Sequence, residues 1–209
     1  SNYIEKNKPD TIIHLAAKIG INECENNREL AWNTNVQGTM NMIDACEKYS
    51  PKCYFVLMST PCVMNGLDEN PKNEFSIPAP ENFYGFTKAM QEMIVKRSRL
   101  PSLVIRSNFF PYGKFPYKKA FSDRRANYFF ANELAGKISK LVKTRLYGTL
   151  HIVSDNICSI YDFAKSCPDS SDVLPMTLEE YYRENPNSPK LTKNMVLSSA
   201  RWNIIKNMI

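Results

Sequence analysis

Tyr84 and Lys88, four residues apart, are the pair in this chain best suited to proton transfer. On a helix this spacing places both side chains on one face. A free tyrosine has a pKa of about 10, and a neighbouring ammonium favours the phenolate and lowers that pKa. Thr60, which follows the apolar segment 53–58, adds a hydroxyl that can hydrogen-bond the same substrate oxygen. Such a set suits proton delivery in carbonyl and alcohol chemistry.

The same spacing arises by chance on amphipathic helices, so its meaning depends on the elements around it. Apolar runs predict a strand within Pro9–Ala17 and strands at Cys53–Met58 and Ser102–Arg106. Helical periodicity predicts helices at Glu29–Tyr49 and Tyr84–Arg99. Strands that alternate with helices indicate a parallel sheet covered by helices on its faces.

Two further segments indicate where a ligand would bind. Ala16 and Ala17 follow the first predicted strand, and small side chains there let a ligand approach the backbone. The run from Pro61 to Pro80 is rich in turn residues and predicts a loop. Because loops carry many binding residues, we expect substrate to enter beside it.

Composition narrows the class of protein. With 209 residues and 43% hydrophobic content, the chain can form one substantial core with a small appended lobe. Its net charge of +6 suits an anionic nucleotide-sugar or NADP(H), although a solvated helix face is the better explanation for any single basic cluster. The chain contains no nucleic-acid-binding motif, no long apolar stretch and no signal peptide. We therefore expect a cytoplasmic protein that binds neither nucleic acid nor membrane.

The cysteines do not indicate a metal site. They form no Cys-x-x-Cys pair and no ligand-like grouping with His14 or His151. We expect reduced and mostly buried thiols. The six positions are 24, 46, 53, 62, 158 and 167.

Five motifs, in this order, resemble those of the extended short-chain dehydrogenase/reductase family. They are Asp10–Ala17, Asn35–Thr39, Ser59–Gly66, Tyr84–Lys88 and Ile105–Ser107. The most similar branch is that of the dTDP-4-dehydrorhamnose reductases. Residues 132–164 resemble the substrate-side segments of that branch. The resemblance implies an α/β fold, with a Rossmann-like parallel sheet that has helices on both faces and a small C-terminal α/β substrate-binding lobe.

The resemblance also divides the chain. Residues 1–110 correspond to a partial Rossmann-like dinucleotide-binding domain that carries the Tyr/Lys pair. Residues 111–209 correspond mainly to the substrate-binding lobe, with some segments returning to the main sheet. The family opens with a glycine-rich turn that holds the dinucleotide pyrophosphate, and this sequence has no such turn. We therefore expect an N-terminally incomplete sheet that keeps the contacts at the nicotinamide end.

The function that the resemblance implies is reduction of a nucleotide-linked 4-keto-6-deoxysugar by NADPH or NADH. Tyr84 would protonate the developing alkoxide, Lys88 would lower the pKa of Tyr84 and hold the nicotinamide ribose, and Thr60 would orient the ketone oxygen. The cofactor-binding residues that it implies are Ala16, Ala17, Lys18, Asn35, Ser59, Tyr84 and Lys88.

On the substrate side the implied residues are Asn108, Phe109, Arg124 and Arg125. Phe109 would pack on the deoxysugar, and a place in the core is the alternative for it. Arg124 and Arg125 are candidates for the diphosphate, because guanidinium groups bind phosphate in a bidentate fork.

Other functions remain open. Cys62, within Thr60-Pro61-Cys62, resembles the cysteine of bifunctional epimerase-reductases. In those enzymes the cysteine helps to move a proton at a carbon next to the ketone. Dehydration is disfavoured, because Pro61 and Cys62 stand where the dehydratases of the family carry Asp and Glu. A non-catalytic, reductase-like binding or regulatory subunit is a further alternative, motivated by the missing glycine-rich turn. Relatives often form homodimers through helices that correspond to Glu29–Tyr49 and Tyr84–Arg99.

Overall fold

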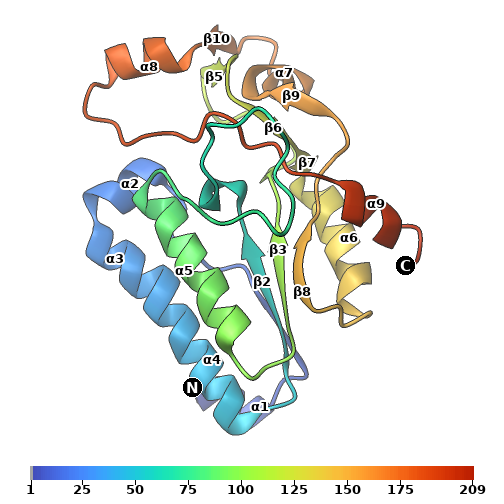
Figure 1. The fold of residues 1–209 in the computed structure, drawn as a ribbon. Helices are drawn as coiled ribbons and strands as arrows, with labels where there is room; N and C mark the ends of the chain where they lie inside the picture. Colours follow the sequence, from blue (N-terminus) through green and yellow to red (C-terminus); the bar gives the residue numbers. More distant parts are fainter. Residues whose placement is uncertain (1) are drawn as a thin grey trace.

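The computed structural model describes residues 2–209 and is built around a four-stranded parallel sheet (Figure 1). The strand order is β1 (Thr11–His14), β2 (Tyr54–Ser59), β3 (Ser102–Arg106) and β8 (Gly148–His151). All three pairings are parallel, so the carboxyl ends of the strands meet at one edge of the sheet. That edge faces the smaller lobe, at the top of Figure 1.

The central strand β2 explains why the sequence forms this sheet. All six of its residues are buried, as expected for a strand that helices cover on both faces. Tyr54, Val56 and Met58 pack toward the helices of one face, and Phe55 and Leu57 pack toward those of the other. Because both sides of the strand face apolar surroundings, every position is apolar, and this explains the unbroken apolar run at residues 53–58.

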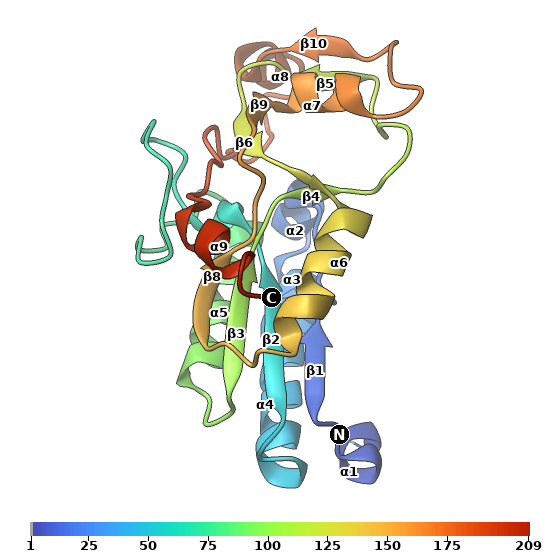
Figure 2. The ribbon, with the colours of Figure 1, turned by 90° about the vertical axis from the view of Figure 1, so that its right-hand side faces the viewer.

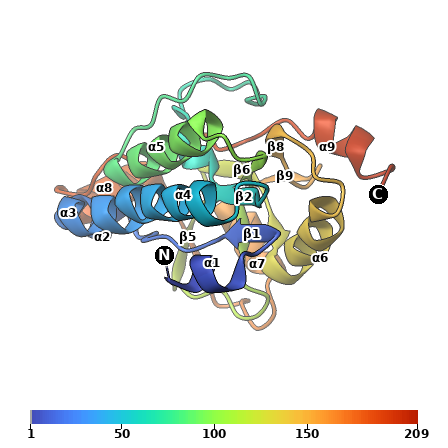
Figure 3. The ribbon, with the colours of Figure 1, turned by 90° about the horizontal axis from the view of Figure 1, so that it is seen from below.

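Helices cover both faces of the sheet (Figure 3). One face carries α2 (Ile21–Asn26), α3 (Arg28–Trp32), α4 (Gly38–Tyr49) and α5 (Phe83–Arg97), with α1 (Asn2–Asn7) packed on α4. The other face carries α6 (Ala131–Val142) and α9 (Ala200–Ile205). A π-helical turn, Asn33–Gln37, joins α3 to α4, so the predicted helix Glu29–Tyr49 is present with a local irregularity.

The smaller lobe lies beyond the carboxyl edge of the sheet (Figure 2). It contains the parallel pair β5 (Lys119–Phe121) and β10 (Leu174–Met176), and the antiparallel pair β6 (Arg125–Asn127) and β9 (Ile157–Ser159). Its helices are α7 (Ile160–Ser166) and α8 (Leu178–Glu184). A short parallel pair, β4 (Phe109–Phe110) and β7 (Phe129–Phe130), connects the lobe to the sheet.

The predicted α/β Rossmann-like fold is confirmed. Strand β3 has the predicted bounds, and β2 and α5 differ from them by one or two residues. Three elements beyond residue 110 return to the main sheet. Strand β8 joins the sheet, and helices α6 and α9 pack on it. All six cysteines are free and five of them are buried. Among residues 2–209, no helix is both long enough and apolar enough to cross a membrane.

Candidate active site

The first turn of α5 carries Tyr84 and is held from three sides. The Asn82 side-chain oxygen caps the helix by accepting a hydrogen bond from the Gly85 amide at 2.9 Å. The same side chain donates to the Lys190 carbonyl at 2.9 Å, and Glu25 accepts from the Phe83 amide at 3.0 Å. These bonds fix Tyr84 relative to both α2 and the C-terminal segment.

A close approach of two backbone segments brings Thr60, Cys62 and Tyr84 together. Thr60 directly follows β2 and caps the 3-10 turn Pro61–Val63 by accepting a hydrogen bond from the Cys62 amide at 3.3 Å. A Cβ atom added to Gly85 would lie closer than 3.0 Å to the Cys62 carbonyl oxygen, so only glycine allows this approach. The Thr60 hydroxyl lies beside the Tyr84 phenol, near enough to act on the pKa of that phenol.

The protonation states differ from the expectation that Lys88 lowers the pKa of Tyr84. Burial, with the nearby Cys62 thiol, raises the pKa of Tyr84, and the Thr60 hydroxyl opposes that rise only in part. Lys88 Nζ instead donates to the Met58 carbonyl at 2.8 Å, and burial lowers the pKa of Lys88 to about 8 against the charge of Glu92. Tyr84 is therefore held as a protonated phenol, the form that donates a proton.

The loop after β1 is fixed by Asn35, which lies in the π-helical turn and is fully buried. Its side chain accepts from the Lys18 amide at 2.7 Å, and it donates to the Lys18 carbonyl at 3.0 Å and to Thr87 at 2.9 Å. The Lys18 side chain pairs with Glu23. In this structure the Asn35 amide therefore positions the Ala16–Lys18 backbone.

A buried polar network next to Lys88 includes His14, a role that the sequence pattern did not indicate. Thr39 donates to the Asn35 carbonyl at 2.6 Å and accepts from Gln91 at 2.7 Å. His14 Nε2 lies 3.0 Å from the same hydroxyl and must be the donor, because the Thr39 proton is already used. Burial, aided by the charge of Lys88, lowers the pKa of His14 to about 4, so this side chain is neutral.

The Ser59 side chain, predicted to contact the cofactor, is engaged within the protein in this structure. The Ser59 hydroxyl is buried and donates to Glu92 Oε1 at 2.6 Å. Ser59 shares the side of β2 that Phe55 and Leu57 occupy, which faces α5, where Glu92 lies. Glu92 also forms a bidentate ion pair with Arg106, at 2.8 and 2.7 Å. Ser59 therefore belongs to a buried ionic network between α5 and β3.

The two arginines assigned to the diphosphate are separated in the structure. They are adjacent at the start of β6, where successive side chains point in opposite directions. Arg124 is buried, and its Nε donates to the Thr192 carbonyl at 3.0 Å. The charge of Arg124 is close enough to Cys62 to act on the pKa of the thiol. Arg125 is exposed and lines a separate cavity of about 390 Å³ together with Lys193. One diphosphate held by both is therefore not supported.

Phe109 does not join the residues around Tyr84. It is 44% exposed and lines an apolar groove with Ile13 and Leu15, on the β1 side of the sheet. The next residue, Phe110, points the other way and stacks on Phe163 at 5.5 Å between ring centroids. Phe110, and not Phe109, therefore packs in the aromatic core of the smaller lobe.

Asn108 has a structural role here. It is buried, and its side chain donates to the Met195 carbonyl at 3.2 Å. Within residues 2–209, no group of three or more His, Cys, Asp or Glu side chains is arranged to hold a metal ion.

A cavity of about 680 Å³ lies between the loop after β1 and the smaller lobe. Ala17 and Lys18 line it on one side, and Tyr117, Tyr181 and Leu191 on the other. Its volume is typical of small-molecule sites, and ligands of open α/β sheets bind outside the carboxyl ends of the strands. This cavity is the candidate entrance for a substrate.

Known proteins are similar to this chain over most of its length. Residues 1–162 match the profile of the NAD dependent epimerase/dehydratase family. The Bacillus subtilis spore coat polysaccharide biosynthesis protein SpsK is 25% identical over 86% of this chain and 69% of its own length.

Solved structures give the same result. A dTDP-4-dehydrorhamnose reductase from Clostridium acetobutylicum is similar with a TM-score of 0.83 and 26% identity, over 98% of this chain and 77% of that chain. The Bacillus anthracis enzyme of the same name, in complex with NADP, has a TM-score of 0.80 and 26% identity, over 97% of this chain and 77% of that chain.

Proposed function

Because the chain belongs to the NAD dependent epimerase/dehydratase family, we propose that it reduces a nucleotide-linked 4-keto-6-deoxysugar with NADPH or NADH. The observation that carries the proposal is the protonated Tyr84 phenol, which lies beside Thr60 and one helical turn from Lys88. The similarity to dTDP-4-dehydrorhamnose reductases over nearly the whole chain supports the same substrate class.

The bound cofactor would supply the hydride, and the remaining chemistry falls to side chains of this chain. The Thr60 hydroxyl orients the ketone oxygen, and Tyr84 gives its proton to that oxygen as negative charge develops. The raised pKa of Tyr84 keeps the proton on the phenol until then. The Lys88 ammonium, at the end of β2, adds positive charge near the developing alkoxide.

The residues present fit the nicotinamide-ribose end of the cofactor. Ala16 and Ala17 carry small side chains at the end of β1, Asn35 fixes the adjacent backbone, and Lys88 lies at the same edge. The glycine-rich turn that would hold the pyrophosphate is not in the sequence. We therefore expect this chain by itself to bind the dinucleotide weakly.

Isothermal titration with NADPH and NADH tests the proposal, on this chain and on a version extended at its amino end by a glycine-rich segment. We expect the extended version to bind and to reduce a dTDP- or UDP-linked 4-keto-6-deoxysugar. If neither version binds either cofactor, the proposal fails and a non-catalytic binding or regulatory subunit is favoured.

Cys62 supports a second candidate activity, 3,5-epimerisation before reduction. Its thiol lies beside both Thr60 and Tyr84, where it would meet a sugar carbon next to the ketone. Burial, however, raises the pKa of Cys62 and disfavours the thiolate. The deuterium content of product formed in D₂O separates the two activities. Epimerisation places solvent deuterium at C3 or C5 of the sugar, and we expect the Cys62→Ser variant to form product without this deuterium.

The pKa of Lys88 predicts the pH dependence of the reduction. Burial lowers this pKa to about 8, so the ammonium loses its proton as the pH rises past that value. We expect kcat/KM for reduction to fall above a pH of about 8, and the fall to move to higher pH in Lys88→Arg, because arginine stays charged. A pH profile that is the same in both proteins would contradict this role.

Gly85→Ala should lower activity by misplacing the phenol. The added Cβ clashes with the Cys62 carbonyl, a backbone atom that cannot move without shifting Thr60. Misplacement of about 1 Å can cost about 10²-fold in rate. The matched control is Gly136→Ala in α6, where an added Cβ meets nothing within 4 Å. Equal steady-state rates for both variants would contradict the prediction.

We also propose a homodimer that pairs through α4 and α5, on which Met40 and Met93 are exposed. Light scattering after size-exclusion chromatography tests it, and a monomer at micromolar concentration would contradict it. A cytoplasmic location is proposed as well, because six free cysteines suit a reducing compartment.

A further inference from the structure

The Thr39 hydroxyl is the meeting point of three buried segments. Thr39 is fully buried in the first turn of α4, and its hydroxyl donates to the Asn35 carbonyl at 2.6 Å. The same oxygen accepts from Gln91 Nε2 at 2.7 Å and from His14 Nε2 at 3.0 Å. A hydroxyl has one proton to donate and two lone pairs that accept, so all of its positions are used. Strand β1, the π-helical turn and α5 are thereby joined at one atom.

The two side chains that donate to Thr39 depend on its hydroxyl. Gln91 is fully buried, and its carboxamide oxygen has no hydrogen-bond partner within residues 2–209, so the bond to Thr39 orients this side chain. His14 is buried and neutral, and a neutral imidazole has a single N–H to donate. Without the Thr39 oxygen, both N–H groups would be buried without this acceptor, and folded proteins seldom leave buried polar groups unpaired.

From Thr39 a chain of hydrogen bonds leads to both halves of the candidate active site. Thr39 fixes the Asn35 carbonyl, and the Asn35 side chain holds the amide and the carbonyl of Lys18 in the loop after β1. The Asn35 side chain also donates to Thr87, whose hydroxyl donates in turn to the Tyr84 carbonyl at 2.8 Å. The loop at Lys18 and the helical turn that carries Tyr84 therefore share one buried chain of bonds.

Asn35 lies in a widened turn of the helix. The backbone of Asn33–Gln37 is π-helical, and the Gly38 amide donates to the Asn33 carbonyl five residues back. Such turns within α-helices are frequent at functional sites. Thr39, the next residue but one after the π-helical turn, donates back into it and so ties the turn to α4. The direction of the Asn35 side chain depends on this turn, and the Thr39 hydroxyl holds the turn in place.

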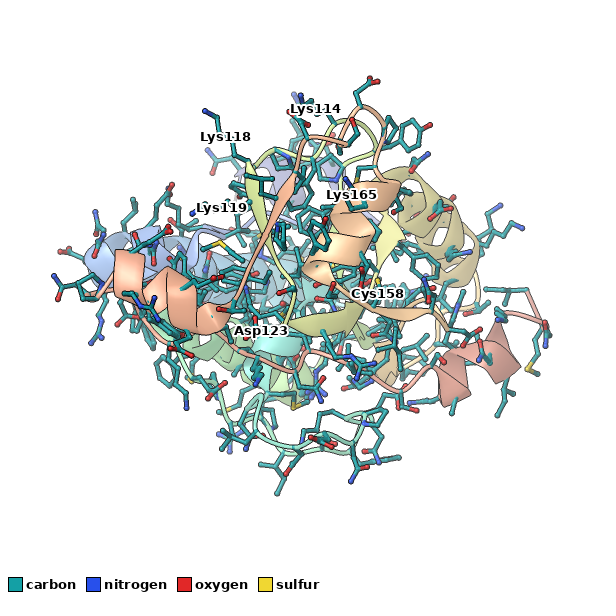
Figure 4. All side chains as sticks on the ribbon, turned by 90° about the horizontal axis from the view of Figure 1, so that it is seen from above. Lys114, Lys118, Lys119, Asp123, Cys158 and Lys165 are labelled. Carbon is teal, nitrogen blue, oxygen red and sulfur yellow. The ribbon has the colours of Figure 1, made fainter. Side chains whose placement is uncertain are left out.

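The charged side chains of the smaller lobe do not make this connection. Lys114 pairs with Asp172 at 3.4 Å, and Lys119 pairs with Glu184 at 2.7 Å, so each pair joins two segments of the lobe to each other. Figure 4 shows both lysines on the outer side of the lobe, away from Asp123 near its middle. The bonds that meet at Thr39 lie instead in the main domain, among β1, the π-helical turn and α5.

We propose that Thr39 is a positioning residue for the reduction. Through Asn35 it holds the loop after β1 and the first turn of α5 in one fixed relation, so that the nicotinamide and the Tyr84 phenol meet the same carbonyl group. The carbonyl carbon gains the hydride that the dihydronicotinamide loses, and the carbonyl oxygen gains the proton that the phenol loses, so both donors must share one geometry. The effect on the reaction rests on the proposed function, whereas the coupling of the two segments does not.

Hydrogen exchange of backbone amides, followed by NMR, tests the coupling without any activity. The Lys18 and Gly85 amides report the two segments, and the Leu57 amide of the central strand reports global opening. We expect Thr39→Val to accelerate exchange at Lys18 and Gly85 by about tenfold relative to Leu57, the size of one net hydrogen bond. Thr39→Ser keeps the hydroxyl and should exchange as wild type, as should the control Thr149→Val, a buried threonine of β8. No acceleration at the two amides, or an equal one at Leu57, would overturn the proposal.

Thr87→Val cuts the chain of bonds on the α5 side only, and it provides the test if Thr39→Val does not fold. This variant removes the hydroxyl that joins Asn35 to the Tyr84 carbonyl. We expect faster exchange at the Gly85 amide and wild-type exchange at the Lys18 amide, which keeps its bond to Asn35. Unchanged exchange at Gly85 would overturn the proposal.

Steady-state kinetics with the extended version of the chain then test the effect on the reaction. We expect Thr39→Val to lower kcat/KM by about 10- to 100-fold and to raise the KM for NADPH, because misplacement of about 1 Å can cost about 10²-fold in rate. The primary isotope effect on kcat with C4-deuterated NADPH should increase, since hydride transfer becomes slower relative to the other steps. A loss of folded protein alone would leave the KM and the isotope effect unchanged, and that result would overturn the positioning role. A wild type without reductase activity would contradict the proposed function, and hydrogen exchange would still decide the coupling.

Discussion

Tyr84→Phe is expected to reduce kcat for the keto-sugar by about 10²- to 10⁴-fold, the usual contribution of a positioned proton donor. The substitution removes only the phenolic oxygen, which is the atom that lies beside Thr60. The ring keeps its place in the packed cluster that contains Cys62 and Tyr128, so the fold should be retained. Substrate binding should change much less than kcat, because the lost proton transfer occurs in the transition state.

Steady-state kinetics with the extended version of the chain measure this effect, together with a melting curve of each protein. Tyr112→Phe is the control, because Tyr112 is 65% exposed and its ring contacts Phe130 rather than the residues around Thr60. Retention of the wild-type kcat in Tyr84→Phe would remove Tyr84 from the mechanism.

Glu92→Gln should have the largest effect on stability. Glu92 and Arg106 form a bidentate pair in which both side chains are almost fully buried, and Ser59 donates to the same carboxylate. Loss of the negative charge leaves Arg106 buried without a counterion, and breaking such a pair costs about 3–5 kcal/mol. The free energy of unfolding in urea measures the loss.

The control for Glu92→Gln is Glu179→Gln, which breaks the exposed pair with Arg183 on α8. Exposed pairs four residues apart on a helix contribute about 0.3–0.5 kcal/mol. Losses of similar size in the two variants would contradict the assignment of Glu92 as a stabilising centre of the fold.

The same pair predicts how stability depends on pH. Burial alone would raise the pKa of Glu92, but the hydrogen bonds and charge of Arg106, with Ser59 and Lys96, hold it below its usual value. A carboxyl whose pKa is lowered in the folded state stabilises the protein above its unfolded pKa, and that stabilisation is lost as the pH falls through the folded pKa. Wild type should therefore lose stability more steeply in acid than Glu92→Gln.

The parts of the fold that follow from local pattern could be predicted from the sequence. Strand β2 is a continuous apolar run because helices cover both of its faces, and that burial is visible in residue types alone. Asn82 before the Tyr84 helix is a typical cap, and the structure shows it in that role. Thr60 and Tyr84 meet because Thr60 follows β2 at the carboxyl edge of the sheet, and α5, the next long helix of the chain, begins beside that edge.

The side-chain directions could not be predicted in the short elements. Strand β4 has two residues, so no alternating pattern indicates which of Phe109 and Phe110 faces the lobe. The separation of Arg124 from Arg125 depends in the same way on where β6 begins. The pKa of Lys88 depends on burial by distant segments, and the hydrogen bonds that His14 and Gln91 donate to Thr39 depend on contacts between segments far apart in the chain.

The most direct test of the central claim follows the transferred hydrogen. The extended version of the chain is incubated with a dTDP-linked 4-keto-6-deoxysugar and NADPH that carries deuterium at C4 of the nicotinamide. Mass spectrometry and NMR then locate the label in the product. The proposed function predicts one deuterium at C4 of the sugar in the product of wild type, and the same labelled product formed about 10²- to 10⁴-fold more slowly by Tyr84→Phe. Product without deuterium at C4, or labelled product formed by Tyr84→Phe at the wild-type rate, would contradict it.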